Sequence, residues 1–178
     1  MRLRFLSFSL FLLLAASAGL TAQKFASIDM ERILSSITEY QEAQEQLDQL
    51  AAKWQQDINQ EYEAIKGMYN KYQAEQVLLS EDQQQAREEE IVNKEKSVRE
   101  LQRQRFGPEG ALFQRRQELV KPIQDAIYEA VERYAETRGY DYIFDRSGGA
   151  AGIIYNSDAF DKTDDILRAL RASNTNRN

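Results

Sequence analysis

The feature that most constrains this chain is a long run, Ile37 to Leu79, which contains no proline and a single glycine. Along it, apolar residues recur at spacings of three, four and seven, the pattern of a helix that packs in a coiled coil. These residues are Ile37, Tyr40, Leu47, Trp54, Ile58, Ile65, Tyr69 and Tyr72, with Ala51 between them. At about 1.5 Å per residue, such a helix is roughly 60 Å long. A helix with one apolar stripe cannot bury that stripe itself, so we expect a partner along its whole length.

The sequence after this run predicts the partner. Ser80 is followed three residues later by Gln83, which is the spacing of a capping box and marks the start of a new helix. The second helix carries its own apolar series, namely Ile91, Val98, Leu101, Leu112, Leu119, Ile123, Ile127, Ala130 and Tyr134. Two helices of matching length with a tight joint near 79–81 predict an antiparallel hairpin, an arm that spans residues 37–138. One continuous rod is the alternative, and the Ser80 cap argues against it.

The stretch "RFGPEGALF" interrupts the second helix at Gly107, Pro108 and Gly110. Proline in a helix interior costs roughly 3 kcal/mol, because it lacks an N–H and crowds the preceding turn. Leu101 and Leu112 are eleven residues apart, close to three helical turns, so the apolar stripe keeps its phase across the interruption. We therefore expect a kink or a short interruption of the return helix near 107–110, and these three residues are candidates for a hinge. A kink without a function is the alternative.

The segments that flank the arm, residues 23–36 and 139–171, predict a small β-containing body. Its expected elements are a strand at Lys24–Asp29, a strand at Tyr140–Asp145, a strand at Gly152–Asn156 and an amphipathic helix at Asp161–Leu170. Asp29 suits a helix N-cap, Gly139 suits a helix C-cap, and the glycine-rich residues 146–151 suit a hairpin turn between the last two strands. The polar tail, residues 172–178, is expected to be disordered. So small a body buries too little apolar surface alone, so we expect an oligomer whose sheets join across subunits.

The N-terminal residues 1–22 have the composition of a secretory signal peptide. Arg2 and Arg4 precede a short apolar stretch, Phe5–Ala16, and small residues then offer cleavage after Ala18 or Ala22. The apolar stretch is short for a membrane anchor, which is the alternative. With no cysteine in the chain, the sequence predicts export of a protein without a lipid anchor, to a bacterial periplasm.

Composition argues against several classes of function. The chain has no histidine and no cysteine, which removes thiolate nucleophiles, the usual zinc ligands and the commonest general base. Loss of Arg2 and Arg4 with the signal peptide changes the formal charge from −6 to −6 − 2 = −8. Nucleic acids and anionic lipids attract basic surfaces, so neither is an expected partner.

Candidate sites for catalysis or metal binding are equally weak. The carboxylate pairs Asp141 with Asp145 and Asp158 with Asp161 lie where strand ends and helix caps commonly carry acids. The glycine-rich residues 147–152 lack the lysine and hydroxyl of a phosphate-binding loop, and the acidic residues near 161–165 lack the spacing of a calcium loop. We therefore expect no catalytic residue, no metal site and no cofactor.

Three stretches carry a resemblance to a known family. They are "IDMERIL" at the start of the arm, "LVKPIQDAIYEAVERYAETRGYDYIFD" at its return and "GIIYNSDAFDKTDDILRAL" near the end. In these residues, and in the order of its expected elements, the chain resembles the Skp/OmpH family of periplasmic chaperones from about Phe25 to Leu170.

The resemblance implies a mostly α fold with a small β part, in which a long coiled-coil hairpin is inserted into a small α/β body. It also implies a homotrimer shaped like a jellyfish, whose arms enclose an unfolded outer-membrane β-barrel protein without using ATP. The client would then pass to the assembly machinery of the outer membrane. Some members of the family are basic and attract clients or lipopolysaccharide by charge. This chain has a sequence pI of about 4.9, so no lipopolysaccharide site is carried over.

Binding an unfolded client needs weak apolar contacts, which tyrosine, methionine and leucine supply without demanding one shape. The candidate client-binding residues are Tyr62, Met68, Tyr69, Tyr72, Leu78 and Phe106. For each of them the alternative is packing inside the hairpin, above all for Tyr69 and Tyr72 on the predicted stripe. A structural spacer or envelope tether is the alternative function, and it needs only the hairpin seam. Met68, Val77 and Phe106 are predicted to lie off that seam, which favours the chaperone.

Overall fold

The computed structural model describes residues 23–148 and 153–175 of the chain. The predicted signal peptide, residues 1–22, lies outside the described residues. Two compact units divide the chain, one formed by Glu31–Glu129 and the other by the segments up to Met30 and from Ala130. The first unit holds most of the predicted arm together with residues 31–36 of the predicted body, and the second holds the rest of the body together with residues 130–138 of the arm.

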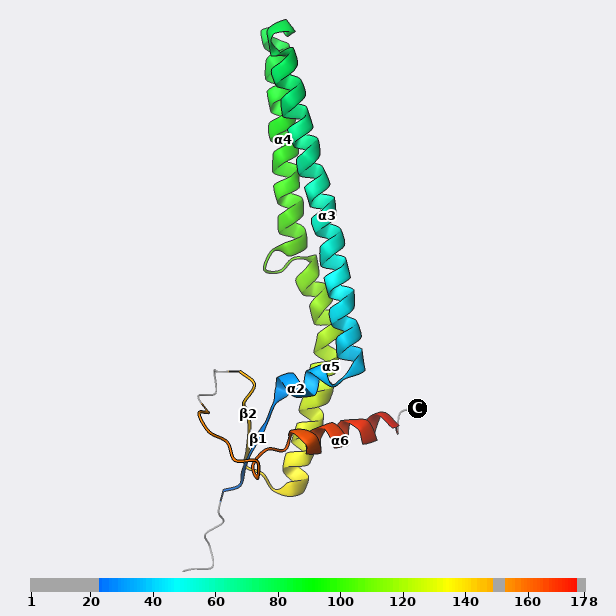
Figure 1. Cartoon of the computed structure of the whole chain (residues 1–178), viewed down its shortest axis with the longest axis vertical. Coiled ribbons are helices and arrows are strands. Elements are labelled where there is room, and N and C mark those ends of the chain that lie inside the picture. Colours follow the sequence, from blue (N-terminus) through cyan, green and yellow to red (C-terminus); the bar gives the residue numbers. More distant parts are fainter. Residues whose placement is uncertain (1–22, 149–152, 176–178) are drawn as a thin grey trace, which may run out of the picture. The chain divides into compact units, whose positions relative to one another are not determined.

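The arm is an antiparallel helical hairpin, as predicted (Figure 1). Helix α2 (Met30–Ser35) precedes the long helix α3 (Thr38–Glu75), and a short 3-10 turn, η2 (Gln76–Leu78), reverses the chain. The return consists of two helices, α4 (Glu81–Phe106) and α5 (Ala111–Arg138). The continuous rod is therefore excluded.

A capping box at Ser80 fixes the start of the return. The Gln83 backbone N–H donates to Ser80 Oγ at 3.4 Å, and the Ser80 N–H donates to Gln83 Oε1 at 3.0 Å. Gln84 Nε2 also donates to the carbonyl of Gln76 at 3.0 Å. These bonds satisfy backbone groups that a helix terminus otherwise leaves free, so the sharp turn is stable in spite of its exposure.

The hairpin core consists of two apolar clusters, one on each side of the break between α4 and α5. The tip-side cluster buries Ile58, Ile65, Ile91 and Val98, with Met68, Tyr72, Leu101 and Phe106 packed against it. The second cluster buries Ala43, Leu47 and Val120, with Tyr40, Leu112, Leu119 and Ile123 packed against it. The apolar stripe thus stays in phase across the break, as the spacing of Leu101 and Leu112 predicts.

The second unit contains a two-stranded parallel sheet. Strand β1 (Phe25–Ile28) pairs with β2 (Tyr142–Asp145), with Phe25 opposite Tyr142. The other edge of β1 bonds to the segment before the last helix: the Ser27 N–H donates to Phe160 O and the Lys162 N–H donates to Ser27 O, both at 2.8 Å. Gly139, with a φ of 66°, ends α5 as the predicted glycine cap.

The predicted strand at Gly152–Asn156 and its hairpin turn are wrong where the structure describes them. Residues 153–156 are irregular, and Gly152 lies outside the described residues. Strand β2 pairs instead with β1 from the N-terminal part of the chain, and residues 160–162 bond to the other edge of β1. Sequence alternation identifies a strand but does not identify its partner.

The last helix, α6 (Thr163–Thr175), begins later and ends later than predicted. The Asp161 carboxylate accepts from the Thr163 N–H at 2.9 Å, which places Asp161 before the helix rather than in it. Residues 172–175 are helical, so the prediction of a disordered tail is wrong for them, and residues 176–178 lie outside the described residues. No glycine or proline follows Leu170 to stop the helix. Across the described ranges, no helix combines the length and apolarity needed to cross a bilayer.

One hydrogen bond ties α6 to the last turns of α5. The Tyr134 hydroxyl donates to Asp165 Oδ2 at 2.7 Å, and Arg168 forms an ion pair with the same carboxylate. The tyrosine hydrogen bond, more than any other contact, lowers the pKa of the Asp165 carboxyl below its usual value. Burial, followed by the bond to Asp165, raises the pKa of Tyr134. The pair therefore consists of a neutral phenol and a carboxylate over the whole physiological range.

We predict that Tyr134→Phe lowers the free energy of unfolding by about 1–2 kcal/mol at neutral pH, because a charged acceptor loses its donor. A carboxyl whose folded pKa is depressed stabilises the fold above its unfolded pKa, and this contribution disappears as the pH falls through the folded pKa. The cost of the substitution should therefore shrink below about pH 4. Urea unfolding of wild type and variant at pH 7 and pH 3 measures it. The exposed Tyr128→Phe is the control, and an equal cost at both pH values would contradict the assignment.

Candidate functional site

Three tyrosines of α3 reach across the hairpin to α4. Their hydroxyls donate in turn from Tyr62 to Gln102 Oε1 at 3.3 Å, from Tyr69 to Glu95 Oε1 at 3.0 Å and from Tyr72 to Glu88 Oε1 at 2.5 Å. The hydrogen bond to Glu95 raises the pKa of Tyr69, and the hydrogen bond to Glu88 raises the pKa of Tyr72, because a phenolate beside a carboxylate is unfavourable. Both hydroxyls therefore remain donors that join the two helices.

The rings of these tyrosines differ in exposure. Tyr62 and Tyr69 are 40% and 41% exposed, whereas Tyr72 packs against the tip-side core cluster. Tyr69 was predicted to lie on the stripe, and it lies beside it. The seam contains Ile58, Ile65, Met68 and Tyr72. Tyr69 follows Met68 by one residue, so its side chain is rotated from the seam by about 100° around the helix axis. Tyr62 and Tyr69 thus combine a bonded hydroxyl with an accessible ring.

Two predicted off-seam residues are in fact part of the hairpin core. Met68 and Phe106 both pack against the tip-side cluster, so the prediction that they lie off the seam is wrong. Phe106 also meets the Trp54 ring edge-on, with centroids 6.2 Å apart and an interplanar angle of 89°. These partly buried side chains stabilise the arm and expose less of their surface than the predicted off-seam position implies.

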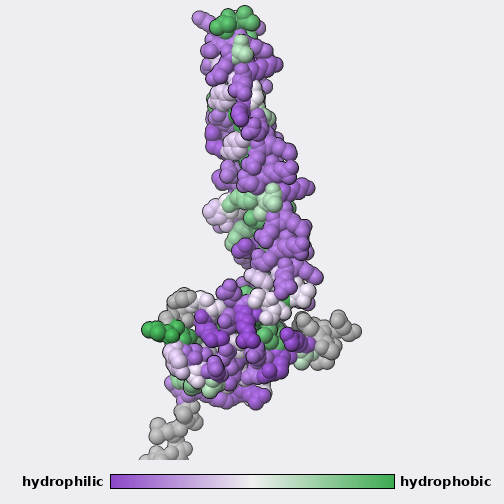
Figure 2. All heavy atoms as spheres, viewed as in Figure 1, coloured by the Kyte–Doolittle hydropathy of each residue, from purple (hydrophilic) through white to green (hydrophobic). Residues whose placement is uncertain are grey.

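The most exposed apolar side chains of the arm lie at its tip. Val77 and Leu78, in the reversing turn η2, are 89% and 82% exposed. A turn at the end of a two-helix hairpin has no facing helix to cover it, so side chains there stay in solvent. Figure 2 shows hydrophobic atoms gathered at this end of the hairpin, whose sides are largely hydrophilic. Leu78 is therefore exposed, as a client-binding residue must be, and Val77 joins it.

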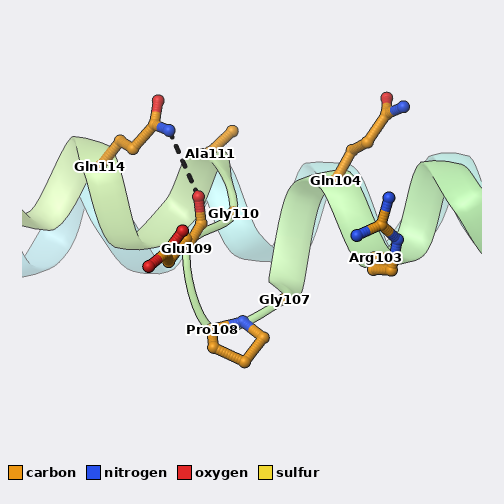
Figure 3. Close-up of a pocket in the computed structure, with 8 residues that line it drawn as sticks. All are labelled: Arg103, Gln104, Gly107, Pro108, Glu109, Gly110, Ala111 and Gln114. Atoms are coloured by element: carbon orange, nitrogen blue, oxygen red, sulfur yellow. Dashed lines mark hydrogen bonds between the residues drawn. The ribbon is translucent and has the colours of Figure 1, made fainter.

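The break between α4 and α5 is a compact turn rather than the kinked continuous helix that was one reading of the sequence. Helix α4 ends at Phe106, and the Gly107 N–H donates to the Arg103 carbonyl at 2.8 Å. The Gly110 N–H then donates to the Gly107 carbonyl at 2.9 Å. The Pro108 ring points away from the helix axis, and Gln114 Nε2 closes the turn on the Glu109 carbonyl at 3.2 Å (Figure 3).

Both glycines of this turn are required by close backbone contact. A Cβ on residue 107 would lie 2.4 Å from the Arg103 carbonyl oxygen. A Cβ on residue 110 would lie 2.9 Å from the carbonyl oxygens of Gln104 and Arg105. Real Cβ atoms do not approach backbone so closely, so the turn depends on residues without a side chain.

A clasp of four side chains holds the last turn of α4 on α3, and sequence reasoning did not identify it. Arg105 Nη1 donates to Asp57 Oδ2 at 3.0 Å and to the Trp54 carbonyl at 3.4 Å. The Arg105 guanidinium also lies over the Trp54 ring, 5.5 Å from its centroid, and Phe106 contacts the same ring. The sequence shows a single tryptophan, Trp54, but not the helix register that brings it opposite the break.

The second unit exposes a separate aromatic face on its sheet. Phe25, Tyr142 and Phe144 stack with ring centroids 5.7 to 6.3 Å apart. They are 40%, 53% and 44% exposed, and Ile154 and Tyr155 of the same unit are 101% and 83% exposed. So much exposed aromatic surface on a small unit is typical of an interaction surface.

Three of the four carboxylates considered for catalysis, Asp141, Asp145 and Asp161, have structural partners. Asp141 Oδ2 accepts from the Lys24 N–H at 2.7 Å, Asp145 Oδ1 accepts from the Ser147 N–H at 2.9 Å, and Asp161 pairs with Arg146 at 2.7 Å. Burial would raise the pKa of Asp145, but the hydrogen bonds from Ser147 and Met30 outweigh it and lower the pKa. In the ranges 23–148 and 153–175, no three acidic side chains converge as a metal site would require.

Comparisons with known proteins agree with this geometry. A family model described as outer membrane protein (OmpH-like) matches residues 24–170. The chain also resembles the crystal structure of an OmpH-like protein from Caulobacter crescentus CB15, described as a candidate outer membrane chaperone. That likeness has a TM-score of 0.67 and 13% identity, and it covers 87% of this chain and 88% of the other. No curated protein matches the chain significantly.

We predict opposite effects for alanine at two glycines of the arm. Gly107→Ala should lower the free energy of unfolding by about 1–3 kcal/mol, because its methyl group collides with the Arg103 carbonyl. Gly67→Ala, in the middle of α3 with nothing within 4 Å of the new methyl group, should raise it by about 0.5–1 kcal/mol. Urea unfolding followed by circular dichroism measures both. Equal effects of the two substitutions would contradict the close packing of the turn.

Proposed function

Because the chain belongs to the OmpH-like outer membrane protein family, we propose that it is an ATP-independent holdase chaperone of the periplasm. It binds unfolded outer-membrane β-barrel proteins and prevents their aggregation before membrane assembly. The observation that carries the proposal is the apolar surface that the arm keeps exposed after its seam is closed. Residues 1–22 would direct export, and the outer-membrane assembly machinery would receive the client.

The exposed apolar surface exceeds what a spacer needs. Two core clusters already bury the stripes of α3, α4 and α5. The hairpin still exposes Tyr62, Tyr69, Val77, Leu78 and Val92. Each such side chain gains at most about 1.5–3 kcal/mol when fully buried against a client, so binding is a sum of weak contacts. Weak contacts release one at a time, which suits a chaperone that uses no ATP.

The client-binding residues divide into two groups. Leu78, together with Val77, forms the tip contact, and Tyr62 and Tyr69 offer ring faces along the arm. Met68, Tyr72 and Phe106 pack against the tip-side cluster. We therefore propose that these three support the arm and do not contact the client in the folded hairpin.

The aromatic face of the second unit supports a homotrimer. Phe25, Tyr142 and Phe144 are stacked and about half exposed, and a two-stranded sheet alone is marginally stable in water. We propose that this face joins copies of the chain, so that the arms of three copies surround one client. When a second copy packs on this face, the aromatic surface is removed from water and the sheet is stabilised.

Light scattering tests the holdase function. A urea-denatured outer-membrane barrel protein is diluted into buffer that contains the mature chain and no nucleotide. We expect suppressed scattering near one oligomer per client. Val77→Ser with Leu78→Ser should require roughly two- to tenfold more chaperone, because two apolar contacts of the tip are lost. Val77→Ile with Leu78→Met keeps the tip apolar and is the matched control.

Two outcomes would contradict the proposal. Unchanged scattering with several clients over a range of ratios would leave an oligomeric coiled coil without holding activity, that is, a spacer or tether. Equal activity of the serine and control variants would remove the tip from the site. Because both tip residues are almost fully exposed, their replacement should not unfold the hairpin.

We also propose that Gly107, Pro108 and Gly110 form a hinge that lets the arm bend around clients of different size. What supports this is the division of the hairpin core into two clusters, one on each side of the break. Helix α3 runs past the break without interruption, so bending would use its elasticity while the return chain opens at the turn.

Spin labels across the break test the hinge. The chain has no cysteine, so Lys96→Cys and Gln117→Cys, both exposed, give a single labelled pair. We expect Pro108→Ala to narrow the distribution of label distances, because alanine restores a backbone N–H that favours helix at that position. The control is Asn93→Ala, a substitution at an exposed residue of α4 that leaves the turn intact. If the distribution of label distances in Pro108→Ala were as wide as in wild type, the turn would not act as a hinge.

A further inference from the structure

We propose that the arm tip selects a class of client segment: extended, unfolded stretches in which apolar side chains are flanked by lysine or arginine. This inference rests on the proposed holdase function and specifies the ligand of its tip site. The tip, here Glu75 to Asp82, joins an apolar apex to an acidic surround. The argument depends on how the charges of the arm are distributed.

The apex is the apolar part. Val77 and Leu78 are 89% and 82% exposed and stand next to each other in the reversing turn η2. Neither belongs to a core cluster of the hairpin. A client side chain that packs on them removes apolar surface from water on both partners, which is the attractive part of the interaction.

The surround of the apex carries negative charge alone. Between Tyr72 and Ala86, the charged residues are Glu75, Glu81 and Asp82, and there is no lysine or arginine. Glu81 and Asp82 lie in the first turn of α4. The helix macrodipole places about half a positive charge there, which offsets only part of their two charges. The field at the apex is therefore negative.

Several basic residues of α4 lie farther from the apex and form ion pairs there. Lys94 pairs with Glu61, Arg99 with Glu95, Arg103 with Glu100 and Arg105 with Asp57. Residues 94–105 contain five basic and two acidic residues, whereas residues 72–90 contain one basic and six acidic residues. The one basic residue of the latter segment, Arg87, pairs with Glu90 at 3.0 Å. The basic residue of α4 nearest the apex is thus neutralised by a carboxylate, and the nearest on α3, Lys71, lies before the tip segment.

This arrangement fits an occupant with the opposite pattern. A segment with apolar residues between cationic ones places its apolar side chains on the apex and its charges near the three carboxylates. An acidic segment of equal apolarity meets repulsion at the same distance. Because the carboxylates are solvent-exposed or half-exposed, each pair changes affinity by at most about fivefold at low salt, and the preference should weaken with ionic strength.

Fluorescence anisotropy with three labelled peptides tests the preference on the full mature chain. The first has a core of leucine, valine and phenylalanine between lysines, the second has the same core between glutamates, and the third has a serine core between lysines. We expect the first to bind about tenfold tighter than the second at about 0.05 M salt, and less than about twofold tighter at about 0.5 M. The third should bind at least about tenfold more weakly than the first, because the apex has nothing apolar to contact.

Matched variants locate the effect. Glu75→Gln with Glu81→Gln and Asp82→Asn should abolish the difference between the lysine and glutamate peptides. Glu39→Gln with Glu42→Gln and Asp48→Asn makes the same change in net charge on exposed residues near the start of α3, and it should preserve the difference. Circular dichroism confirms that both variants remain helical.

Several results would overturn the inference. Equal binding of the lysine and glutamate peptides to wild type would show that charge does not select the client. An equal loss in both charge variants would assign the preference to net charge and not to the tip. Binding of the tip to phosphatidylglycerol vesicles in place of the peptides would make lipid the occupant. The scattering assay separates the two proposals: suppressed aggregation without a lysine preference refutes this inference alone, whereas unsuppressed aggregation refutes the holdase function as well.

Discussion

The apolar stripe of α3 must be covered along its whole length, and the rest of the arm follows from this requirement. An isolated helix of this polarity is marginal in water, and most of its stability comes from packing. The chain meets the requirement by turning back at Ser80, where the capping box makes the reversal sharp. The return chain then keeps its own stripe in phase over two helices, so that both core clusters face α3.

The parts of the fold that depend on local sequence could be predicted, and those that depend on distant pairing could not. The capping box at Ser80 and the glycine cap at Gly139 are local signals, and both were predicted. The parallel pairing of β1 with β2 joins segments more than a hundred residues apart, and alternation within a strand carries no information on its partner. The predicted strand at Gly152–Asn156 failed for this reason, and the end of α6 failed because no stop signal marks it.

The candidate site could be predicted only in part, because the apolar stripe of a long helix gradually changes its position around the helix axis. A helix of 3.6 residues per turn and a heptad of 3.5 disagree by about 20° per heptad, so neighbouring residues exchange places at the seam over a long arm. Sequence alone could not decide between Met68 and Tyr69, and the structure places Met68 in the core and Tyr69 half in solvent. Leu78 was predicted as a client contact beside the joint at 79–81, and the structure places it in the turn η2, where no facing helix covers it. The clasp at Trp54 and Arg105 needed the register of the two helices, which the sequence does not give.

The tyrosine bridges explain how a thin arm keeps aromatic surface in water and still holds together. Each bridging hydroxyl of Tyr62 and Tyr69 is bonded across the hairpin, so the ring is held by its polar end and its face remains accessible. A leucine at the same position would have no such anchor and would favour collapse onto the seam or onto another arm. A bonded tyrosine therefore supplies apolar area that binds weakly and stays in place. The bare apex of Val77 and Leu78 has no such anchor. In the proposed homotrimer, the acidic residues around the apex would have the corresponding role, because like charges would keep the tips of neighbouring copies apart while the apolar side chains stay exposed.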